Sequence, residues 1–259
     1  MRPVEYWQIC RMKCLVATLI LGAALIPCTA AYAEVKTIVL VHGAFADGSG
    51  WKPVADILQS HGYSVRVVQE PETSFAADVA ATRRVLDKAG PSVLVGHSYG
   101  GMIISETGMN PDIKALVYVG AVQPDVGESL SDLADKMPPA AKSIGPGPVG
   151  DGFLAVNPDA FPNDFAADVP EPLARFMAIS QVPVSGDALK AKATVAAWKQ
   201  KPSYAVIPMQ DRMINPDLER FMTKRAESEV IELPGSHAIF LSHAREVAAL
   251  IEKAAAAAK

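Results

Sequence analysis

Apolar runs and helical segments alternate along most of this chain, in an order that few folds can accommodate. Six runs rich in β-branched residues are expected to be strands: Thr37–Val41, Ser64–Val68, Ser92–Val95, Ala115–Val119, Tyr204–Ile207 and Val230–Leu233. Most are apolar throughout, which is typical of strands buried on both faces. Helical segments separate the first four, at Trp51–Ser60, Ala76–Ala89 and Gly101–Met109. Since each connection is long enough for a crossover helix, the pattern predicts a six-stranded, mostly parallel sheet with helices on both faces.

The stretch from about residue 122 to residue 202 breaks this rhythm. It is rich in Pro, Gly, Asp and Ala, with helical pieces near Leu130–Lys136, Glu171–Ile179 and Gly186–Trp198. An insertion of this length is uncommon as a bare loop. The sequence therefore predicts a cap inserted after the fourth strand. A last helix is expected over Ala244–Lys253, followed by a frayed alanine tail at Ala254–Ala258.

The first 33 residues have the pattern of an export signal. Arg2, Arg11 and Lys13 precede a short apolar run, and Ala31-Tyr32-Ala33 matches a cleavage site. The apolar run is too short to span a membrane comfortably, although an uncleaved anchor is the alternative. We expect a periplasmic or secreted protein whose mature domain is residues 34–259, with no stable membrane span after cleavage.

Composition excludes several kinds of site in the mature chain. All three cysteines lie in the first 33 residues, so the mature chain would contain none. A disulfide framework, a cysteine nucleophile and a cysteine metal site are therefore excluded. Cleavage also changes the net charge from −4 to −6. An acidic chain of this kind gives no sign of nucleic-acid binding. No cofactor or metal is expected, and the oligomeric state cannot be read from the sequence.

The run Gly96-His97-Ser98-Tyr99-Gly100 points to the chemistry. It is a G-x-S-x-G motif between the apolar run Val93–Val95 and the helical segment that starts at Gly101. This strand, sharp turn and helix form the setting in which the motif builds a nucleophile elbow. The flanking glycines leave room for a crowded backbone, and the helix N-terminus stabilises negative charge. An ordinary glycine-rich turn is the alternative interpretation.

A serine nucleophile needs a general base, and the mature chain offers five histidines. His237 follows the last strand. It comes last in the chain order Ser, Asp, His that accompanies a serine in a nucleophile elbow. We predict it as the base, with a helix-capping histidine as the alternative. The positions of the other four histidines suggest structural roles. His42 is expected to brace the loop after the first strand, and His61 to end a helix. The His97 side chain is expected to point away from the site, and His243 to lie on a solvated helix start.

The base needs a carboxylate partner, and the oxyanion needs two backbone donors. Asp211 follows the fifth strand and is the predicted acid, whereas Asp125, after the fourth strand, is the second candidate. We expect the Tyr99 N–H, directly after the serine, to be one donor. The Ala44 N–H, in the loop after the first strand, is expected to be the other.

Several of these segments resemble the α/β-hydrolases related to plant methyl-salicylate esterases and hydroxynitrile lyases. Leu40–Ala44 with Gly48–Trp51 is similar to their opening, and Gly96–Met102 is similar to their elbow. Asp211 and Ser236-His237 match their acid and base segments. The likeness spans nearly the whole mature chain, apart from a divergent cap. It implies an α/β-hydrolase fold, a capped pocket, small ester substrates and no cofactor.

The chain departs from the lyases at two positions. Where they carry a hydroxyl residue and a lysine, it has Ala44 and Ala238. We therefore predict a carboxylic ester hydrolase that acts through an acyl-enzyme with Ser98, His237 and Asp211. Two alternatives stay open: a carbon–carbon lyase like the hydroxynitrile lyases, and a receptor-like module that binds small molecules and turns over slowly. Apolar residues of the cap are expected to shape the acyl pocket, among them Phe153, Phe161, Phe165, Phe176 and Trp198.

Overall fold

A computed structural model describes residues 35–139 and 143–258. The expected export segment, residues 1–33, lies outside the described residues. The described residues belong to one compact unit.

Six parallel strands form the central sheet of this unit. They are β1 (Thr37–Val41), β2 (Ser64–Val67), β3 (Ser92–His97), β4 (Ile113–Val119), β8 (Ser203–Pro208) and β9 (Glu229–Leu233). Their order across the sheet is β2-β1-β3-β4-β8-β9, and every neighbouring pair is parallel. All six strands were predicted from the apolar runs, and β1 agrees at both ends. Strand β3 runs two residues further than predicted because Gly96 and His97 also pair with β4.

The register brings the carboxyl ends of the central strands to one edge of the sheet. Val41 pairs with Gly96, so the loop after β1 starts beside the end of β3. Pro208 pairs with Leu233, so the loops that follow β8 and β9 start side by side. Segments far apart in sequence, each ending a strand, therefore meet at this edge, where open parallel sheets commonly bind ligands.

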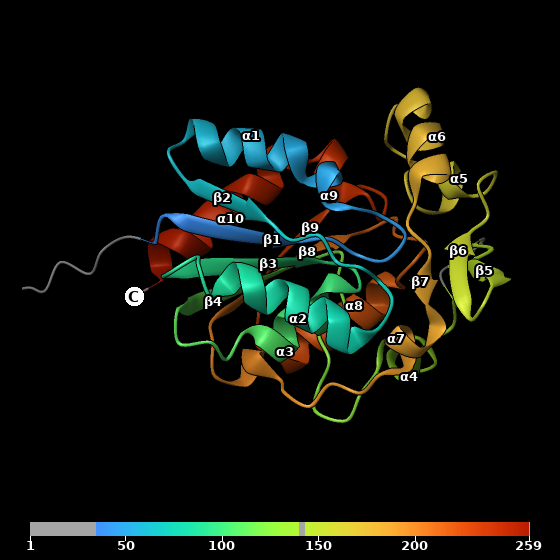
Figure 1. Ribbon diagram of the computed structural model, residues 1–259. Coiled ribbons are helices and arrows are strands. Elements are labelled where there is room, and N and C mark those ends of the chain that lie inside the picture. Colours follow the sequence, from blue (N-terminus) through green and yellow to red (C-terminus); the bar gives the residue numbers. More distant parts are fainter. Residues whose placement is uncertain (1–34, 140–142, 259) are drawn as a thin grey trace, which may run out of the picture. The chain divides into compact units, whose positions relative to one another are not determined.

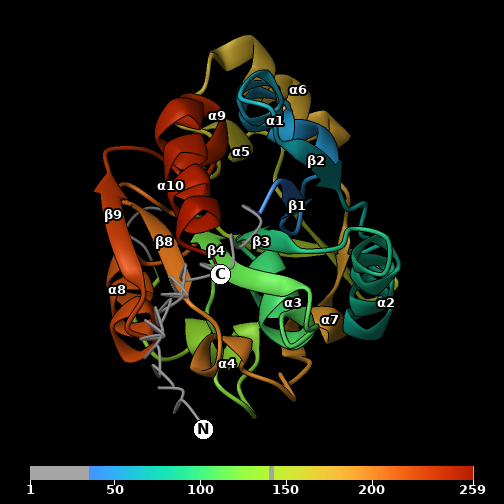
Figure 2. The ribbon, with the colours of Figure 1, turned by 90° about the vertical axis from the view of Figure 1, so that its left-hand side faces the viewer.

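Helices cover both faces of the sheet (Figures 1 and 2). One face carries α1 (Lys52–Ser60) and α10 (Ala244–Ala257), which also pack against each other. The opposite face carries α2 (Phe75–Leu86), α3 (Gly100–Thr107) and α8 (Pro216–Arg225). This two-sided cover explains why most of the central strands are apolar at consecutive positions.

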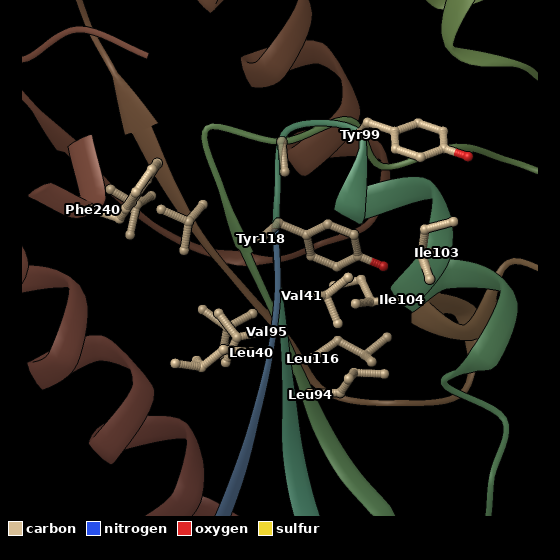
Figure 3. Packing of buried hydrophobic residues seen from close by; sticks show 14 of the residues in the cluster. Leu40, Val41, Leu94, Val95, Tyr99, Ile103, Ile104, Leu116, Tyr118 and Phe240 are labelled. Carbon is tan, nitrogen blue, oxygen red and sulfur yellow. The ribbon is translucent and has the colours of Figure 1, made fainter. Parts of the chain in front are cut away.

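Figure 3 shows the packing of these faces. Successive side chains of a strand point to opposite faces, so Leu40 lies on one side of the sheet and Val41 on the other. Val41 lies on the side of Ile103 and Ile104 of α3. All four side chains are fully buried, and burying each stabilises the fold by roughly 1.5–3 kcal/mol.

The C-terminal alanines are helical, in contrast to the frayed tail that was predicted. Helix α10 continues to Ala257, and Ala254 and Ala255 are completely buried. The packing of these methyl groups against the body of the domain stabilises a turn that would fray in isolation.

The segment between β4 and β8 holds more strand than the sequence suggested. A small antiparallel sheet is formed by β5 (Pro146–Gly150), β6 (Phe153–Val156) and β7 (Val184–Ser185), in that order. The prolines of β5 were interpreted as loop signals, but β5 is an edge strand, where a missing N–H is tolerated. The helices of this segment are α4 (Leu130–Ala134), α5 (Phe161–Asp164), α6 (Glu171–Ser180) and α7 (Gly186–Lys190).

The small sheet and helices α4 to α7 lie at the carboxyl ends of the central strands, and the chain then runs back to the start of β8 (Figure 1). The helix expected over Gly186–Trp198 was wrong in extent. It is divided into α7 and a separate 3₁₀ turn, η2 (Ala197–Lys199), because Glu106 of α3 binds the intervening backbone amides of Thr194 and Val195. We call residues 122–202 the cap.

Candidate active site

Ser98 lies in the sharp turn between β3 and α3. Its φ of 52° is in the left-handed region, which a non-glycine residue adopts only when its surroundings impose it. The Ser98 N–H donates to the carbonyl oxygens of Val119 and Gly120, at 3.3 and 3.1 Å. The Ser98 carbonyl accepts from Gly101 N–H at 2.9 Å and from Val122 N–H at 3.3 Å. The turn after β4 therefore holds the strained serine on both sides.

The loop after β1 lies directly against this turn. A Cβ atom on Gly43 would stand 2.6 Å from Ser98 Cβ, and a Cβ on Gly100 would stand 2.6 Å from the His42 carbonyl oxygen. Neither separation is possible for real side chains, so both positions require glycine. The structure thus brings Ala44, the residue after Gly43, next to the predicted nucleophile.

His42 sets the direction of the Ala44 amide. His42 Nε2 accepts the Glu70 N–H at 3.0 Å, so its proton is on Nδ1, which donates to the Gly43 carbonyl oxygen at 3.0 Å. Burial lowers the pKa of His42, which keeps the ring neutral. In a trans peptide the N–H points opposite to the C=O, so this bond turns the Ala44 N–H away from His42. The expectation that His42 braces this loop agrees with these contacts.

His237 and Asp211 meet at the same edge of the sheet. The His237 Nδ1 and Asp211 Oδ2 atoms are 2.6 Å apart, and both side chains are buried. The other oxygen of Asp211 accepts the backbone N–H groups of Met213 at 2.7 Å and Ile214 at 2.9 Å. Because a carboxylate only accepts hydrogen bonds, Nδ1 of His237 carries a proton. In the neutral ring the lone pair is then on Nε2, the nitrogen that a general base would use.

Asp125, the second candidate for the acid, lies elsewhere. Its carboxylate is 2.5 Å from the ammonium nitrogen of Lys199. That hydrogen bond lowers the pKa of Asp125. Position after a strand did not separate Asp125 from Asp211 in the sequence, but the structure pairs only Asp211 with the predicted base.

His97 contacts the base, whereas the sequence suggested that it points away from the site. Its ring centroid is 4.6 Å from that of His237, and its Nε2 donates to the His237 carbonyl oxygen at 3.0 Å. Burial keeps the pKa of His97 well below its usual range, so the ring is neutral and acts as a donor at one nitrogen. His97 is the last residue of β3, and from this position its side chain contacts the loop that follows β9.

The cap also reaches the base. The Phe165 ring meets the His237 ring edge-on at 4.8 Å and stacks on Phe161 at 4.6 Å. The Phe165 carbonyl oxygen accepts the Ala238 N–H at 2.9 Å. No contact with the base is seen for the other expected cap aromatics among the described residues. Trp198 donates to the Pro124 carbonyl oxygen, Phe176 is largely exposed on α6, and Phe153 is half-buried in β6.

The comparisons with known proteins agree with this architecture. A family model described as the alpha/beta hydrolase family matches residues 38–250. The chain belongs to this family. It is 32% identical over 125 residues to the carbendazim hydrolyzing esterase of Nocardioides sp. (strain SG-4G), a match that covers 41% of this chain. The matched part spans about half, 52%, of that esterase.

Solved structures share the fold of this hydrolase. A pyrethroid hydrolase from Sphingobium faniae JZ-2 is 23% identical with a TM-score of 0.72, over 86% of this chain and 98% of its own. Polyneuridine aldehyde esterase is 20% identical with a TM-score of 0.73, over 85% and 99%. The resemblance to the methyl-salicylate esterase group is confirmed at the level of the fold.

Beside the site of this hydrolase is an apolar cavity of about 250 Å³. It lies between the loop after β1 and cap helix α6, and its lining includes Phe45, Phe176, Met177 and Phe240. Among residues 35–139 and 143–258, no helix has the length and hydropathy needed to cross a membrane. In the same ranges no group of three or more His, Cys, Asp or Glu side chains could hold a metal ion.

Three buried acids near the site were not singled out from the sequence. Glu70, Glu72 and Asp78 follow β2, and burial raises the pKa of each. The Tyr99 hydroxyl donates to Asp78 Oδ2 at 2.9 Å, so the residue after Ser98 is tied to this group. Acidic residues usually lie on the surface, and nothing local in the sequence marks these as buried.

Proposed function

We propose that this hydrolase cleaves small carboxylic esters through an acyl-enzyme on Ser98. The observation that carries the proposal is the buried His237–Asp211 pair at the sheet edge where the left-handed Ser98 also lies. The names of two similar proteins, a carbendazim hydrolyzing esterase and polyneuridine aldehyde esterase, support an ester substrate.

In the first half-reaction Ser98 Oγ attacks the acyl carbon while His237 Nε2 takes the hydroxyl proton. The Ala44 and Tyr99 N–H groups donate to the oxyanion that forms on the carbonyl oxygen. When the intermediate collapses, the C–O bond to the alcohol breaks, and His237 returns the proton to the leaving alkoxide.

In the second half-reaction water attacks the acyl carbon of the ester on Ser98. His237 removes a proton from that water and then gives it to the departing Ser98 oxygen, so the carboxylic acid is released and the enzyme is regenerated. Asp211 keeps the His237 ring in the required tautomer and stabilises its positive charge in both halves.

Labelling with a fluorophosphonate tests the nucleophile. We expect one covalent label, on the peptide that contains Ser98. Ser98→Ala should lose the label and about 10⁴-fold or more in kcat with the fold intact. Ser60→Ala, at an exposed serine that ends α1, should keep both. A label on another residue of the active protein would contradict the assignment.

The buried methyl group of Ala238 favours an esterase over a lyase. Ala238 is completely buried, and its methyl group offers neither a charge nor a hydrogen bond to a departing cyanide. Nitrophenyl esters of increasing acyl length, assayed beside mandelonitrile, separate the alternatives. We expect ester turnover without cyanide release. Cyanide release would select the lyase, and tight binding with negligible turnover would select the receptor-like module.

We also propose that the chain is exported and cleaved after Ala33. The charged start, the short apolar run and Ala31-Tyr32-Ala33 support this. Sequencing the N-terminus of protein from the periplasm or the medium should give Glu34-Val35-Lys36. Cytoplasmic protein that retains Met1 would contradict it.

A further inference from the structure

Glu72 uses all three of its hydrogen-bonding groups to connect different parts of the domain. Its carboxyl Oε2 accepts the Phe45 N–H, in the loop after β1, at 3.4 Å. Its own N–H donates to Asp78 Oδ1 of α2 at 2.8 Å. Its carbonyl oxygen accepts the Ser185 N–H of cap strand β7 at 2.8 Å. One residue therefore links the loop that carries Ala44, the helix that binds Tyr99 and the cap.

The backbone of Glu72 is held in a costly conformation. Its φ is 55°, in the left-handed region that non-glycine residues seldom adopt, and Phe45, at the other end of the contact, has a φ of 63°. Such conformations cost of order 1–3 kcal/mol each and persist only where surrounding contacts impose them. The hydrogen bonds that the Glu72 backbone makes with Asp78 and Ser185 are contacts of that kind. They fix the backbone in a conformation that places the carboxyl group beside the Phe45 amide.

We infer that Glu72 is a positioning residue that holds residues 43–45, which we call the oxyanion loop, and couples this loop to the cap. The inference rests on the proposed function, because the loop matters only if the Ala44 amide binds an oxyanion. Glu72 touches no reacting atom and acts through the backbone of residues 43–45. The carboxyl does this in its protonated form, as a neutral acceptor for the Phe45 N–H.

The surroundings of the carboxyl favour that neutral form. Burial raises the pKa of Glu72 to about 9, and the negative charges of Asp78 and Asp47 contribute in the same direction. The titratable groups that face it are Asp47 and His42 from the loop after β1, Asp78 from α2, Tyr99 at the start of α3, and Glu70 on its own loop. Because His42 is neutral, no cation compensates a Glu72 carboxylate on this side, and ionisation would place a negative charge beside the site of the developing oxyanion.

The test compares Glu72→Ala and Glu72→Gln with a matched control, Glu106→Ala. Glu106 is also a buried acid that accepts backbone amides, those of Thr194 and Val195, but it lies at the far end of α3. Glu72→Ala should lower kcat on a nitrophenyl ester by about 10–100-fold with KM within about threefold, since a displaced oxyanion donor costs less than a missing one. Glu106→Ala should change kcat by less than about twofold.

The pH profile separates positioning from a purely structural role. Wild-type kcat should fall as the pH rises through about 9, because Glu72 ionises. Glu72→Gln keeps a neutral acceptor and cannot ionise, so it should retain wild-type kcat at pH 7 and lose the alkaline decline. If Glu72→Ala has wild-type kcat, or if Glu72→Gln keeps the alkaline decline, the inference is wrong.

Amide hydrogen exchange provides a readout that does not depend on activity. Glu72→Ala should speed exchange at the Phe45 and Ser185 amides by about tenfold or more, whereas Glu106→Ala should affect only the Thr194 and Val195 amides. A wild-type protein that cleaves no ester and takes no label on Ser98 would refute the proposed function. The exchange data would then still decide the coupling: unchanged Phe45 and Ser185 amides in Glu72→Ala would overturn it.

Discussion

Two buried acids, one against the predicted base and one against the loop after β1, are held in different ways. On the base side Asp211 accepts three donors, from His237, Met213 and Ile214, all within 2.9 Å. On the oxyanion side the Glu72 carboxyl accepts one N–H at 3.4 Å, and burial raises its pKa to about 9. Three donors compensate a buried carboxylate charge, and one long hydrogen bond does not. The carboxyl group on the base side is therefore held by several hydrogen bonds, whereas burial favours the neutral form of the one on the oxyanion side.

The largest expected effect is on the base side. Asp211→Asn should leave His237 in the wrong tautomer and lower kcat by about 10³–10⁴-fold. Asp125→Asn, which breaks only the contact with Lys199, should cost less than about threefold. Steady-state kinetics on one ester decides between them, and the reverse order would place the acid after β4 instead of β8.

A smaller effect is expected behind the base. His97→Phe keeps a ring against Phe240 and Phe165 but removes the hydrogen bond to the His237 carbonyl oxygen. We expect kcat to fall about tenfold, since a small displacement of a catalytic group is costly. The exposed His61, replaced in the same way, serves as the control. Unchanged kcat in His97→Phe would show that the loop after β9 needs no support from β3.

The neutral acids also predict how stability depends on pH. The folded-state pKa of Glu72 is about 9, and burial raises the pKa values of Glu70 and Glu219 well above their usual range. The unfolded chain releases these protons near pH 4.5, so the free energy of unfolding should fall as the pH rises from about 5 to about 9. Glu72→Gln should reduce that fall by about 1–3 kcal/mol. Urea unfolding at several pH values measures it, and the exposed Glu246→Gln should leave the fall as it is.

The smallest expected effect lies in the cap. Phe176 lines the apolar cavity and is 62% exposed, so Phe176→Ala should barely change stability. We expect KM for bulky nitrophenyl esters to rise about threefold with kcat unchanged, because less apolar surface is buried against the substrate. Ile179, on the same helix but outside this cavity, provides the control as Ile179→Ala. A change in kcat would mean that the cavity influences the reacting groups directly.

The meeting of His237 and Asp211 could be predicted from the sequence, whereas the contacts of the loop after β1 could be predicted only in part. Ser98, Asp211 and His237 each follow a strand whose apolar run is visible, so parallel topology is enough to bring them to one edge. The role of Glu72 could not be predicted in this way. Its cap partner, Ser185, is 113 positions away and belongs to a two-residue strand, and its burial depends on long-range packing. The cap sheet could not be predicted for a similar reason. The prolines and glycines of β5 are typical of loops, and β5 forms a strand only because it pairs with β6.

The link between the cap and the oxyanion loop has a consequence for redesigning this enzyme. Both partners of the Ser185–Glu72 hydrogen bond are main-chain atoms, so any residue except proline at position 185 can supply the donor. Libraries that randomise cap side chains to admit new substrates would therefore leave this connection intact. Insertions or deletions that shift the register of β7 would break it, and the same substrate pocket would then sit over a less active centre.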